Sequence, residues 1–446
     1  MCGLIVMLGE GPNRAAIAAI MARGLNAMGH RGLPGRMDYW LGDNTALGHV
    51  RLPIRGLGPE YDQPFDEGDW VGIFAGEIFT TTQENDALFT LKELQNKGPT
   101  FLHDHDGFWA MALHNKYSGV TAVITDHMSI KPLYYHVSVG IIASELKAIE
   151  AMTDNLTINK HFMSNVIKWG YDPSLRTPYN EVLRLKSGYA YLFMGKQGLT
   201  QGRYFEMKPK VVDLRTEIIR AVENRLVSDV PVATLCSGGL DSTIVSLIAA
   251  RKTEGPMTVF HIDNGESEYF DLIDWPSNVT ISKLELEPTS LEKAMQATEE
   301  PVDLGSVLPQ YQLGKAVHDA GFKVVLSGDG ADELFGGYRR AQEYDSQWSD
   351  VFSELIHYHL PRLDKTMMAS TVELRSPFLA PNVIQGALAL PYDQRTKKQM
   401  LKSLFSDIVP KGILDREKKP LKTQAVIQGG IEYRKMLVDM FMQRRK

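Results

Sequence analysis

Apolar and polar residues alternate in blocks that divide the second half of the chain into strands and helices. Residues 211–229 carry apolar side chains at helical spacing, and residues 232–236 form a short apolar run typical of a buried strand. A second helical block ends near residues 251–255 and is followed by another apolar run at 257–262. Because a crossover helix joins two parallel strands, this order predicts a parallel sheet with its ligand at the carboxyl ends of the strands.

Further blocks of both kinds follow towards the C-terminus. A strand is predicted over 279–286, helices over 289–298 and 308–320, and a buried strand over 323–326. The last residues, 434–446, are basic, and we expect them to be frayed.

Composition places the chain among ordinary globular proteins. Of its residues, 43% are hydrophobic and 23% are charged, as is ordinary for such proteins. At 446 residues the chain is long for one domain, so two or three are expected. The net charge of −6 gives no basic surface for nucleic acid, and we find neither an 18-residue apolar run nor the charged start of a signal peptide. The two cysteines, Cys2 and Cys236, cannot form a disulfide framework, and no zinc-ligand spacing is present. We therefore expect a cytoplasmic protein without a nucleic-acid or membrane partner.

A glycine-rich turn joins the strand at 232–236 to the next helix. Residues 237–242 read Ser-Gly-Gly-Leu-Asp-Ser, so free backbone N–H groups and a helix dipole converge on one point and favour phosphate. Asp241 beside an anion site makes sense mainly if a Mg²⁺ lies between the two. The turn has no lysine and so lacks the Walker pattern. An ordinary glycine-rich turn is the alternative.

A second motif follows the strand at 323–326. Residues 327–338 read Ser-Gly-Asp-Gly-Ala-Asp-Glu-Leu-Phe-Gly-Gly-Tyr, and three acidic residues within five positions are unfavourable unless they serve a cation or a reaction. The alternative is a solvated acidic loop. The first motif resembles the pyrophosphate-binding loop of enzymes that split ATP into AMP and pyrophosphate, and the second resembles a signature of asparagine synthetases and their relatives. Segments at 372–379 and 416–418 resemble further parts of the same family.

The resemblance implies roles for the residues of both motifs. Asp332 joins Asp241 in holding Mg²⁺ on pyrophosphate, and Asp329 orients or deprotonates incoming ammonia near the reacting acyl group. Lys398, at the start of a helix near 397–402, balances charge on the α-phosphate and the departing pyrophosphate; solvation is the alternative for this lysine. The residues implied in binding ATP are Ser237, Gly238, Gly239, Leu240, Asp241, Ser242, Ser327 and Gly328.

The chain opens with a cysteine in a suggestive position. Methionine aminopeptidase removes Met1 when a small residue follows, so Cys2 would carry both a thiol and a free α-amine. That amine has a pKa near ~8 and can act as a base for the thiol. A buried cysteine at the start of a first strand is the alternative.

Fragments of the first half resemble, in order, the class II glutamine amidotransferase domain. They include Gly-His-Arg-Gly at 29–32, His-Val-Arg-Leu-Pro-Ile at 49–54 and Ala-Gly-Glu-Ile at 75–78. The resemblance implies an N-terminal-nucleophile fold with two stacked antiparallel sheets between helices. Its strands are expected at 4–9, 46–51, 71–75, 108–114, 120–125, 133–137 and 140–143, with a final hairpin over 186–205.

By the same resemblance, Cys2 is the nucleophile that attacks the amide of glutamine. Arg51 pairs with the α-carboxylate of glutamine, Glu77 and Asp86 hold its α-ammonium, and the N–H of Gly76 is an oxyanion donor. For Arg51 and Asp86 taken singly, a solvated surface charge is the alternative.

Two departures from the family pattern stand out. The family has Asn-Gly-Glu where this chain has Ala75-Gly76-Glu77, and alanine cannot supply the second oxyanion donor. Because losing one such donor typically costs ~10²–10³ in rate, we expect a slow or absent glutaminase and ammonia as the practical nitrogen source. Residues 125–127 read Thr-Asp-His where the family usually has Arg-Asp, and we expect this departure to change the local geometry near the domain interface.

Taken together, the chain resembles the glutamine-dependent asparagine synthetases over nearly its whole length. This implies an α/β and α+β fold of two domains, an αββα amidotransferase sandwich at 2–208 and a parallel-sheet synthetase domain at 209–446. It also implies that ATP, with Mg²⁺, activates aspartate as β-aspartyl-AMP, that glutamine or free ammonia supplies nitrogen, and that the protein is a homodimer.

Two other functions remain open. A related amide-forming synthetase would act on another carboxylic acid, although β-lactam and carbapenam synthetases usually lack the cysteine and carry tyrosine near the position of Asp329. A non-catalytic relative would keep the fold alone. The sequence does not identify a residue that recognises aspartate specifically.

Overall fold

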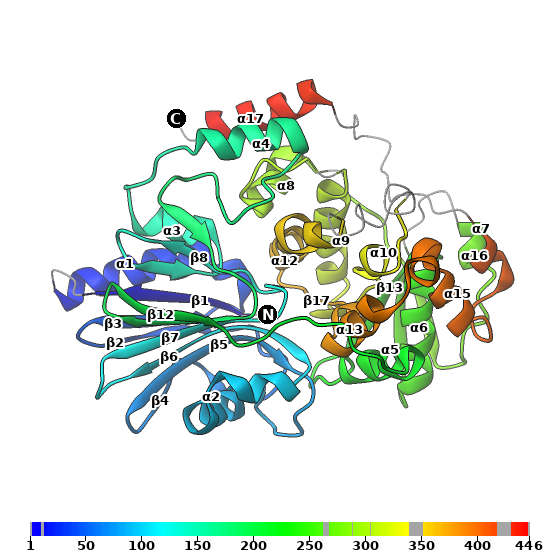
Figure 1. Ribbon diagram of the computed structural model, residues 1–446, viewed down its shortest axis with the longest axis horizontal. Helices are drawn as coiled ribbons and strands as arrows, with labels where there is room; N and C mark the ends of the chain where they lie inside the picture. The colour runs from blue at the N-terminus through cyan, green and yellow to red at the C-terminus, as the bar shows by residue number, and fades with distance from the viewer. Residues whose placement is uncertain are drawn as a thin grey trace.

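Two layered bodies lie side by side in the computed structural model, one built on antiparallel strands and the other on a parallel sheet (Figure 1). The structure describes residues 2–9, 13–261, 267–287, 289–303, 305–338, 351–416 and 430–444. The expectations on Met1, on residue 262, on 417–418 and on 445–446 lie outside these residues. We call the part up to residue 203 the first body and the part from residue 214 the second body.

The first body is a sandwich of two six-stranded antiparallel sheets. One sheet has the order β10-β8-β9-β1-β3-β2 and the other β12-β11-β7-β6-β5-β4. The strands of the former are β1 (Gly3–Leu8), β2 (Met37–Leu41), β3 (Thr45–Val50), β8 (Tyr134–His136), β9 (Ile141–Ala143) and β10 (Val182–Arg184). Those of the latter are β4 (Phe65–Glu67), β5 (Trp70–Ile78), β6 (Gly107–Asn115), β7 (Val120–Thr125), β11 (Tyr189–Met194) and β12 (Gln197–Arg203).

Strand alternation separates the interior of the sandwich from its outer faces. Leu4 and Val6 of β1 pack with Val71 and Ile73 of β5 between the sheets, whereas Ile5 points to the other side. Helix α1 (Arg14–Ala27) covers the outer face of the first sheet and α2 (Asp86–Lys97) that of the second. The predicted αββα sandwich is therefore confirmed, with all seven expected strands and the final hairpin β11–β12 in place.

The second body is built on the predicted parallel sheet. Its order is β15-β14-β13-β16-β17, and every pair is parallel. The strands are β13 (Val232–Cys236), β14 (Met257–His261), β15 (Val279–Lys283), β16 (Val324–Leu326) and β17 (Glu373–Arg375). Chain order reverses between β13 and β16, and ligands of open α/β sheets bind at the carboxyl ends of strands at such a point.

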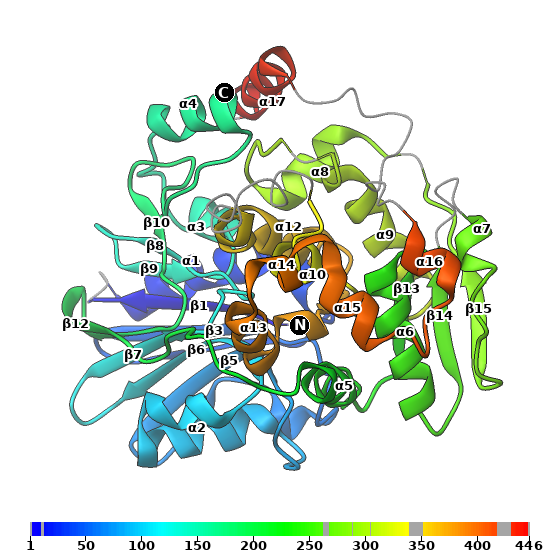
Figure 2. The same cartoon turned by 45° about the vertical axis from the view of Figure 1, so that its right-hand side comes forward.

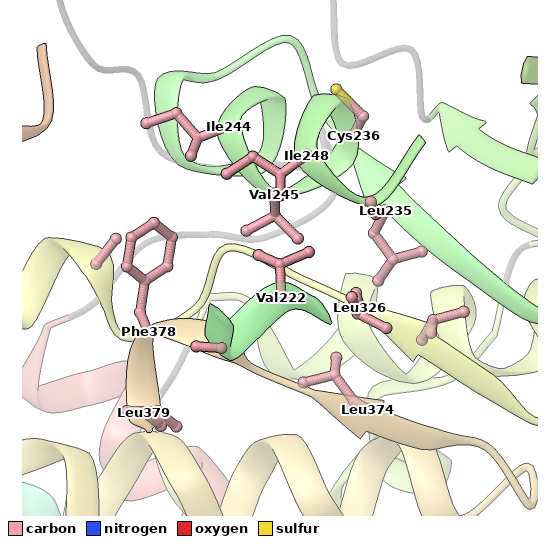
Figure 3. Close-up of a cluster of buried hydrophobic side chains, with 14 of the residues drawn as sticks. Val222, Leu235, Cys236, Ile244, Val245, Ile248, Leu326, Leu374, Phe378 and Leu379 are labelled. Atoms are coloured by element: carbon pink, nitrogen blue, oxygen red, sulfur yellow. The ribbon is translucent and has the colours of Figure 1, made fainter. Parts of the chain in front are cut away.

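Helices pack on both faces of this sheet. The predicted ones are α5 (Leu214–Asn224), α6 (Leu240–Lys252), α8 (Leu291–Thr298) and α9 (Val307–Asp319). Figure 3 shows Val222 of α5 and Val245 of α6 in one buried cluster with Leu326 of β16 and Leu374 of β17. This packing fixes the start of α6, and with it the glycine-rich turn, against the strand ends.

The remaining helices complete both bodies. They are α3 (Leu146–Met152), α4 (Lys160–Trp169), α7 (Ser267–Phe270), α10 (Ala331–Leu334), α12 (Leu360–Met368), α13 (Pro381–Ala389), α14 (Tyr392–Arg395), α15 (Gln399–Leu404), α16 (Lys411–Asp415) and α17 (Ile431–Gln443). Helix α12 lies between the two bodies and packs on α8, α9 and β17 (Figures 1 and 2). No helix in the described ranges has the combination of length and apolar character that crossing a bilayer requires.

The expectation of a frayed C-terminus is wrong for residues 434–443. These residues lie in α17, which returns to the first body and runs along α4 (Figures 1 and 2). Leu437, Val438 and Phe441 are buried, and their spacing forms an apolar helical face. Arg434 Nε bonds Asp303 Oδ2 at 2.6 Å, so a basic residue taken as a sign of fraying is an anchor.

Candidate active sites

The glycine-rich turn lies at the carboxyl end of β13 and opens α6, as the sequence predicts. Gly238 has a φ of 75°, and a Cβ there would lie 2.9 Å from the backbone nitrogen of Phe270. A Cβ on Gly328 would lie 2.8 Å from Asp241 Cβ and from the nitrogen of Ser242. Both glycines are therefore needed for close approach, and the second one brings the acidic loop against the turn.

The lysine predicted to balance phosphate charge joins the two loops. Lys398 is buried, and its Nζ binds Asp241 Oδ2 and, at 2.5 Å, Asp332 Oδ1. Burial opposes the charge of this lysine, but the two carboxylates raise its pKa above its ordinary value. Solvation, the alternative for Lys398, is therefore wrong for this structure.

An unusual backbone holds this lysine in place. Lys397 and Lys398 have φ values of 54° and 55°, in the left-handed region that is uncommon for residues other than glycine. Their N–H groups donate to Gly336 O at 3.1 Å and to Phe335 O at 2.8 Å, so the segment is tied to the end of the acidic loop. Strained backbone of this kind is found mostly at functional sites.

The predicted magnesium residues match Mg²⁺ in number and kind, and in this structure the ammonium of Lys398 lies between them. Asp241 and Asp332 reach the same ammonium group, so their carboxylates converge on one point. Mg²⁺ is commonly held by one or two carboxylates together with substrate phosphates. No group of three or more His, Cys, Asp or Glu residues suited to a metal occurs in the described part of the chain, so the fit depends on phosphate as a further ligand.

Asp329 lies on the same loop but faces a different set of groups. Its Oδ2 accepts a hydrogen bond from Ser327 Oγ at 2.7 Å, and its Oδ1 is 3.8 Å from Arg362 Nη2. Its side chain is 32% exposed, which leaves it open to a small molecule. Glu333, in contrast, is buried and accepts from the hydroxyl of Tyr338 at 2.7 Å.

Cys2 stands directly before β1, at the inner face of the sandwich. The residue is buried, and its Sγ is 3.9 Å from Leu52 O. Burial raises the pKa of the thiol, and the nearby Arg51 opposes this rise. The carbonyl oxygen of Cys2 accepts a hydrogen bond from Arg31 Nε at 3.0 Å.

Strand β5 carries two residues predicted to bind glutamine: Gly76 for the oxyanion and Glu77 for the α-ammonium group. Ala75 is buried in the same cluster as Cys2, because alternate residues of β5 face β1. Glu77 is also buried, and its burial, with the charges of Asp86 and Glu373, raises the pKa of its carboxyl well above the ordinary value. A Cβ on Gly76 would lie 2.1 Å from Phe108 O, so only glycine fits between β5 and β6 at this position.

Arg51 and Asp86 are both buried, so a solvated surface charge is the wrong description for either. The guanidinium of Arg51 bonds Gly58 O at 2.8 Å, Asp62 Oδ1 at 3.0 Å and Gly56 O. Asp86 Oδ2 accepts from the nitrogen of Ile78 at 2.7 Å, at the end of β5.

The unusual Thr-Asp-His segment lies where the two bodies meet. Asp126 caps a buried turn by accepting from the nitrogens of Met128, Ile130 and Lys131, each at 2.9 Å. His127 Nε2 lies 2.9 Å from Leu379 O of the second body. The expectation that this departure is at the domain interface is confirmed.

A small cavity of about 20 Å³ lies where the two bodies meet. It is large enough for one water-sized molecule. Its lining is mostly apolar and comes from both bodies: Phe108, Ile130, Lys131, Leu360, Leu363, Asp364, Leu374, Ser376 and Leu379.

Sequence reasoning missed several charged residues around these sites. Arg31 lies in the Gly-His-Arg-Gly fragment, but nothing in that fragment indicates that it reaches Cys2 and a distant carboxylate. Arg362 and Asp364 precede the recognised segment at 372–379 and share one short helix, whose apolar pattern gave no sign of the two sites that it faces.

The chain matches two family models. The asparagine synthase model matches residues 213–355 and 346–445, and the glutamine amidotransferase domain model matches residues 1–205. The two ranges matched by the asparagine synthase model together cover residues 213–445, which is more than half of the chain.

The chain is also similar to curated asparagine synthetases and to one solved amidotransferase structure. The chain is 27% identical to asparagine synthetase B [glutamine-hydrolyzing] of Escherichia coli (strain K12), over 88% of this chain and 76% of that protein. It is 26% identical to the probable asparagine synthetase [glutamine-hydrolyzing] of Acanthamoeba polyphaga mimivirus, over 94% and 84%. A glutamine phosphoribosylpyrophosphate amidotransferase from B. subtilis has a TM-score of 0.34 and 13% identity, over 78% of this chain and 79% of that one.

Proposed function

Because the chain belongs to the asparagine synthase family, we propose that it converts aspartate to asparagine while splitting ATP into AMP and pyrophosphate. The observation that carries the proposal is the meeting of the glycine-rich turn and the acidic loop at the carboxyl ends of β13 and β16. There Lys398 lies between Asp241 and Asp332. The curated relatives named above point to the same reaction.

The first step activates the side chain of aspartate. An oxygen of the β-carboxylate attacks the α-phosphorus of ATP, the bond to the β-phosphate breaks, and pyrophosphate leaves with the electron pair. The residues proposed to bind ATP are those of the turn and the start of the acidic loop, where backbone N–H groups and the dipole of α6 favour phosphate. Lys398 stabilises the charge that develops on pyrophosphate. The product is β-aspartyl-AMP.

Asp241 and Asp332 are proposed to hold Mg²⁺ together with the phosphates of ATP. When bound, the ion would neutralise part of the charge on the departing pyrophosphate.

The second step forms the amide. The lone pair of ammonia attacks the acyl carbon of β-aspartyl-AMP, and AMP leaves with the electron pair of the broken C–O bond. Asp329 is proposed to accept the proton that the attacking nitrogen loses, because its carboxylate is partly exposed at the loop.

Glutamine is the second proposed source of nitrogen. The α-amine of Cys2 takes the proton of the thiol, and the thiolate attacks the amide carbon. The C–N bond then breaks as the protonated amine returns its proton to the leaving nitrogen, which departs as ammonia, and water hydrolyses the thioester to glutamate. Arg51, Glu77 and Asp86 are proposed to hold the substrate, and the N–H of Gly76 to stabilise the oxyanion. Because Ala75 offers no second donor, this half-reaction is proposed to be slow, with free ammonia as the practical source.

Three further properties are proposed. The domain boundary between residues 208 and 209 is supported by the end of β12 at Arg203 and the start of α5 at Leu214. A cytoplasmic location is supported by the two free cysteines, both of which are buried. A homodimer is proposed from the family resemblance alone.

A pyrophosphate-release assay over a panel of carboxylic acids, with ammonia and Mg-ATP, tests the function. We expect pyrophosphate and AMP in equal amounts with aspartate, and asparagine as the product. Release with another acid and not with aspartate would favour a related synthetase. If no acid causes release of pyrophosphate, the result would favour a non-catalytic relative that keeps only the fold.

A further inference from the structure

Arg31 connects the candidate nucleophile to a carboxylate of the other body. Its Nε donates to Cys2 O at 3.0 Å. Its Nη1 and Nη2 donate to Asp364 Oδ2 and Oδ1 at 2.9 and 3.3 Å, and Nη1 also bonds Glu145 at 2.7 Å. Arg31 is only 1% exposed, and a Cβ on Gly3 would lie 3.1 Å from its Cδ. The side chain is therefore closely packed against the first residues of the chain.

Asp364 belongs to α12, the helix that lies between the two bodies (Figure 2). A second cation from the first body, Lys131, binds Asp364 Oδ1 at 2.7 Å. Burial opposes its ionisation, but Arg31 and Lys131 hold the pKa of this carboxyl below its ordinary value. Asp364 is thus a charged, buried group with one partner that touches Cys2.

The same helix also reaches the other candidate site. Arg362, two residues before Asp364, places its Nη2 3.8 Å from Asp329 Oδ1. Helix α12 packs on α9, α8 and β17, so its position is set by the second body. One rigid element therefore touches the acid of the synthetase site at one position and the support of the nucleophile at another.

We propose that Asp364 is a positioning residue for Cys2, acting through Arg31. Cys2 precedes the ladder of β1, which begins at Gly3, so its carbonyl relies on the guanidinium for its orientation. The two carboxylate oxygens of Asp364 accept hydrogen bonds from the two Nη groups of Arg31. This bidentate pairing orients the guanidinium so that its Nε donates to the carbonyl of Cys2. The proposal rests on the proposed role of Cys2 as the nucleophile towards glutamine.

The consequence for catalysis is geometric. A misplacement of a reacting atom by about 1 Å can lower a rate about 10²-fold. If Arg31 loses Asp364, it keeps Glu145 and can rotate towards it, which releases the carbonyl of Cys2. We therefore expect the reaction of Cys2 with a glutamine-like molecule to slow, whereas the synthetase site, which uses neither Arg31 nor Cys2, keeps its reaction with ammonia.

The test uses a charge-balanced double variant. Replacing Asp364 alone would leave Lys131 buried without its partner, which destabilises a protein strongly. Asp364→Asn with Lys131→Met removes one negative and one positive charge, so the net charge near Cys2 is unchanged. A change in the labelling rate of Cys2 then reflects a change in the position of Cys2 more than a change in the local electric field. The matched control is Arg184→Met with Glu300→Gln, which removes another buried ion pair between the bodies, at 2.6 Å. Neither residue is among the hydrogen-bond partners of Arg31, which are Cys2, Glu145 and Asp364.

Cys2 is labelled with a diazoketone analogue of glutamine and, separately, with iodoacetamide, and peptide mapping by mass spectrometry separates Cys2 from Cys236. For the Asp364→Asn, Lys131→Met variant we expect the diazoketone rate to fall at least about tenfold. Its iodoacetamide rate and its ammonia-dependent formation of asparagine are expected to stay within about threefold of wild type. The control variant is expected to match wild type in both labelling rates.

Three results would overturn the proposal. They are an unchanged diazoketone rate, an equal loss with both reagents, and the same loss in the control variant. A wild-type Cys2 that does not react with the analogue would remove its premise and also contradict the proposed glutamine site. Failure of the synthetase function is recognised separately, as wild-type protein that releases no pyrophosphate with aspartate.

Discussion

The alanine at position 75 allows a gain-of-function experiment on the glutaminase half. Ala75→Asn would restore the amide that the family pattern has at this position. The side chain at 75 faces the interior of the sandwich, in the cluster that contains Cys2. Its partner across the strands is Ala110, which is also small and buried, so the added amide has no bulky neighbour opposite it.

The expected size of the gain follows from what one oxyanion donor contributes. Such a donor is worth ~10²–10³ in kcat, or ~2.7–4 kcal/mol of transition-state stabilisation. The cost falls on folding, because Ala75 is 1% exposed and a buried amide without a partner destabilises by ~1–3 kcal/mol. A natural domain is stable by ~5–15 kcal/mol, so the variant should remain folded.

The assay measures glutamate released from glutamine by wild type, Ala75→Asn and Ala75→Leu. Leucine has nearly the shape of asparagine but no donor, so it separates the effect of the hydrogen bond from that of added volume. Ammonia-dependent formation of asparagine serves as the internal control, since the side chain at position 75 lies in the interior cluster of the first body that contains Cys2. Unfolding in urea shows whether each variant retains its fold.

Three outcomes would refute the reasoning. The first is a wild-type glutaminase that already matches the ammonia-dependent turnover, because no donor would then be missing. The second is a folded Ala75→Asn protein with no gain. The third is an equal gain for Ala75→Leu, which would show that volume and not hydrogen bonding limits the reaction.

Three further predictions concern other parts of the molecule. Lys398→Met should lower the rate of pyrophosphate formation by ~10²–10³, measured at saturating aspartate, and an unchanged rate would exclude its role on the leaving group. Because folding raises the pKa of Glu77, protonation of this carboxyl contributes to the free energy of unfolding. That contribution is fully present below the ordinary pKa of 4.5 and is lost as the pH rises through the folded-state pKa. Wild type should therefore lose more unfolding free energy than Glu77→Gln as the pH is raised above 4.5; equal pH slopes would contradict this. Phe441→Ala, on the buried face of α17, should destabilise by ~3–5 kcal/mol in urea unfolding, and a loss below ~1 kcal/mol would mean that α17 is not docked.

The elements that the sequence predicts well are those with a strong period and clear ends. Strand β13 occupies the predicted residues 232–236, and β7 the expected 120–125. The positions of helices α1 and α2 were not predicted, although each has a side-chain cap that the sequence displays: Asn13 accepts from Ala16 N and Asn85 from Leu88 N. These two asparagines mark the starts of both helices in the sequence.

The candidate sites divide in the same way. Local motifs predicted the glycine-rich turn, the acidic loop and their approach, because both follow buried parallel strands whose carboxyl ends share one edge of the sheet. They did not predict that Lys398 occupies the space between Asp241 and Asp332. That contact depends on a left-handed backbone at Lys397 and Lys398, and lysine shows no preference for this conformation.

The connection between the two sites lies beyond what local patterns can show, for a physical reason. Arg31 and Asp364 are separated by 333 positions, and each sits in a segment whose neighbours give no hint of a partner. A buried charge must be paired, so burial of Arg31 would predict a carboxylate in contact with it, but only the packing of α12 between the bodies decides which one. Because α12 also carries Arg362 to Asp329, the placement of this helix determines the surroundings of both sites at once. A substitution in the core of the second body that shifts α12 should therefore change the position of Cys2, and with it the rate at which Cys2 reacts with a glutamine analogue.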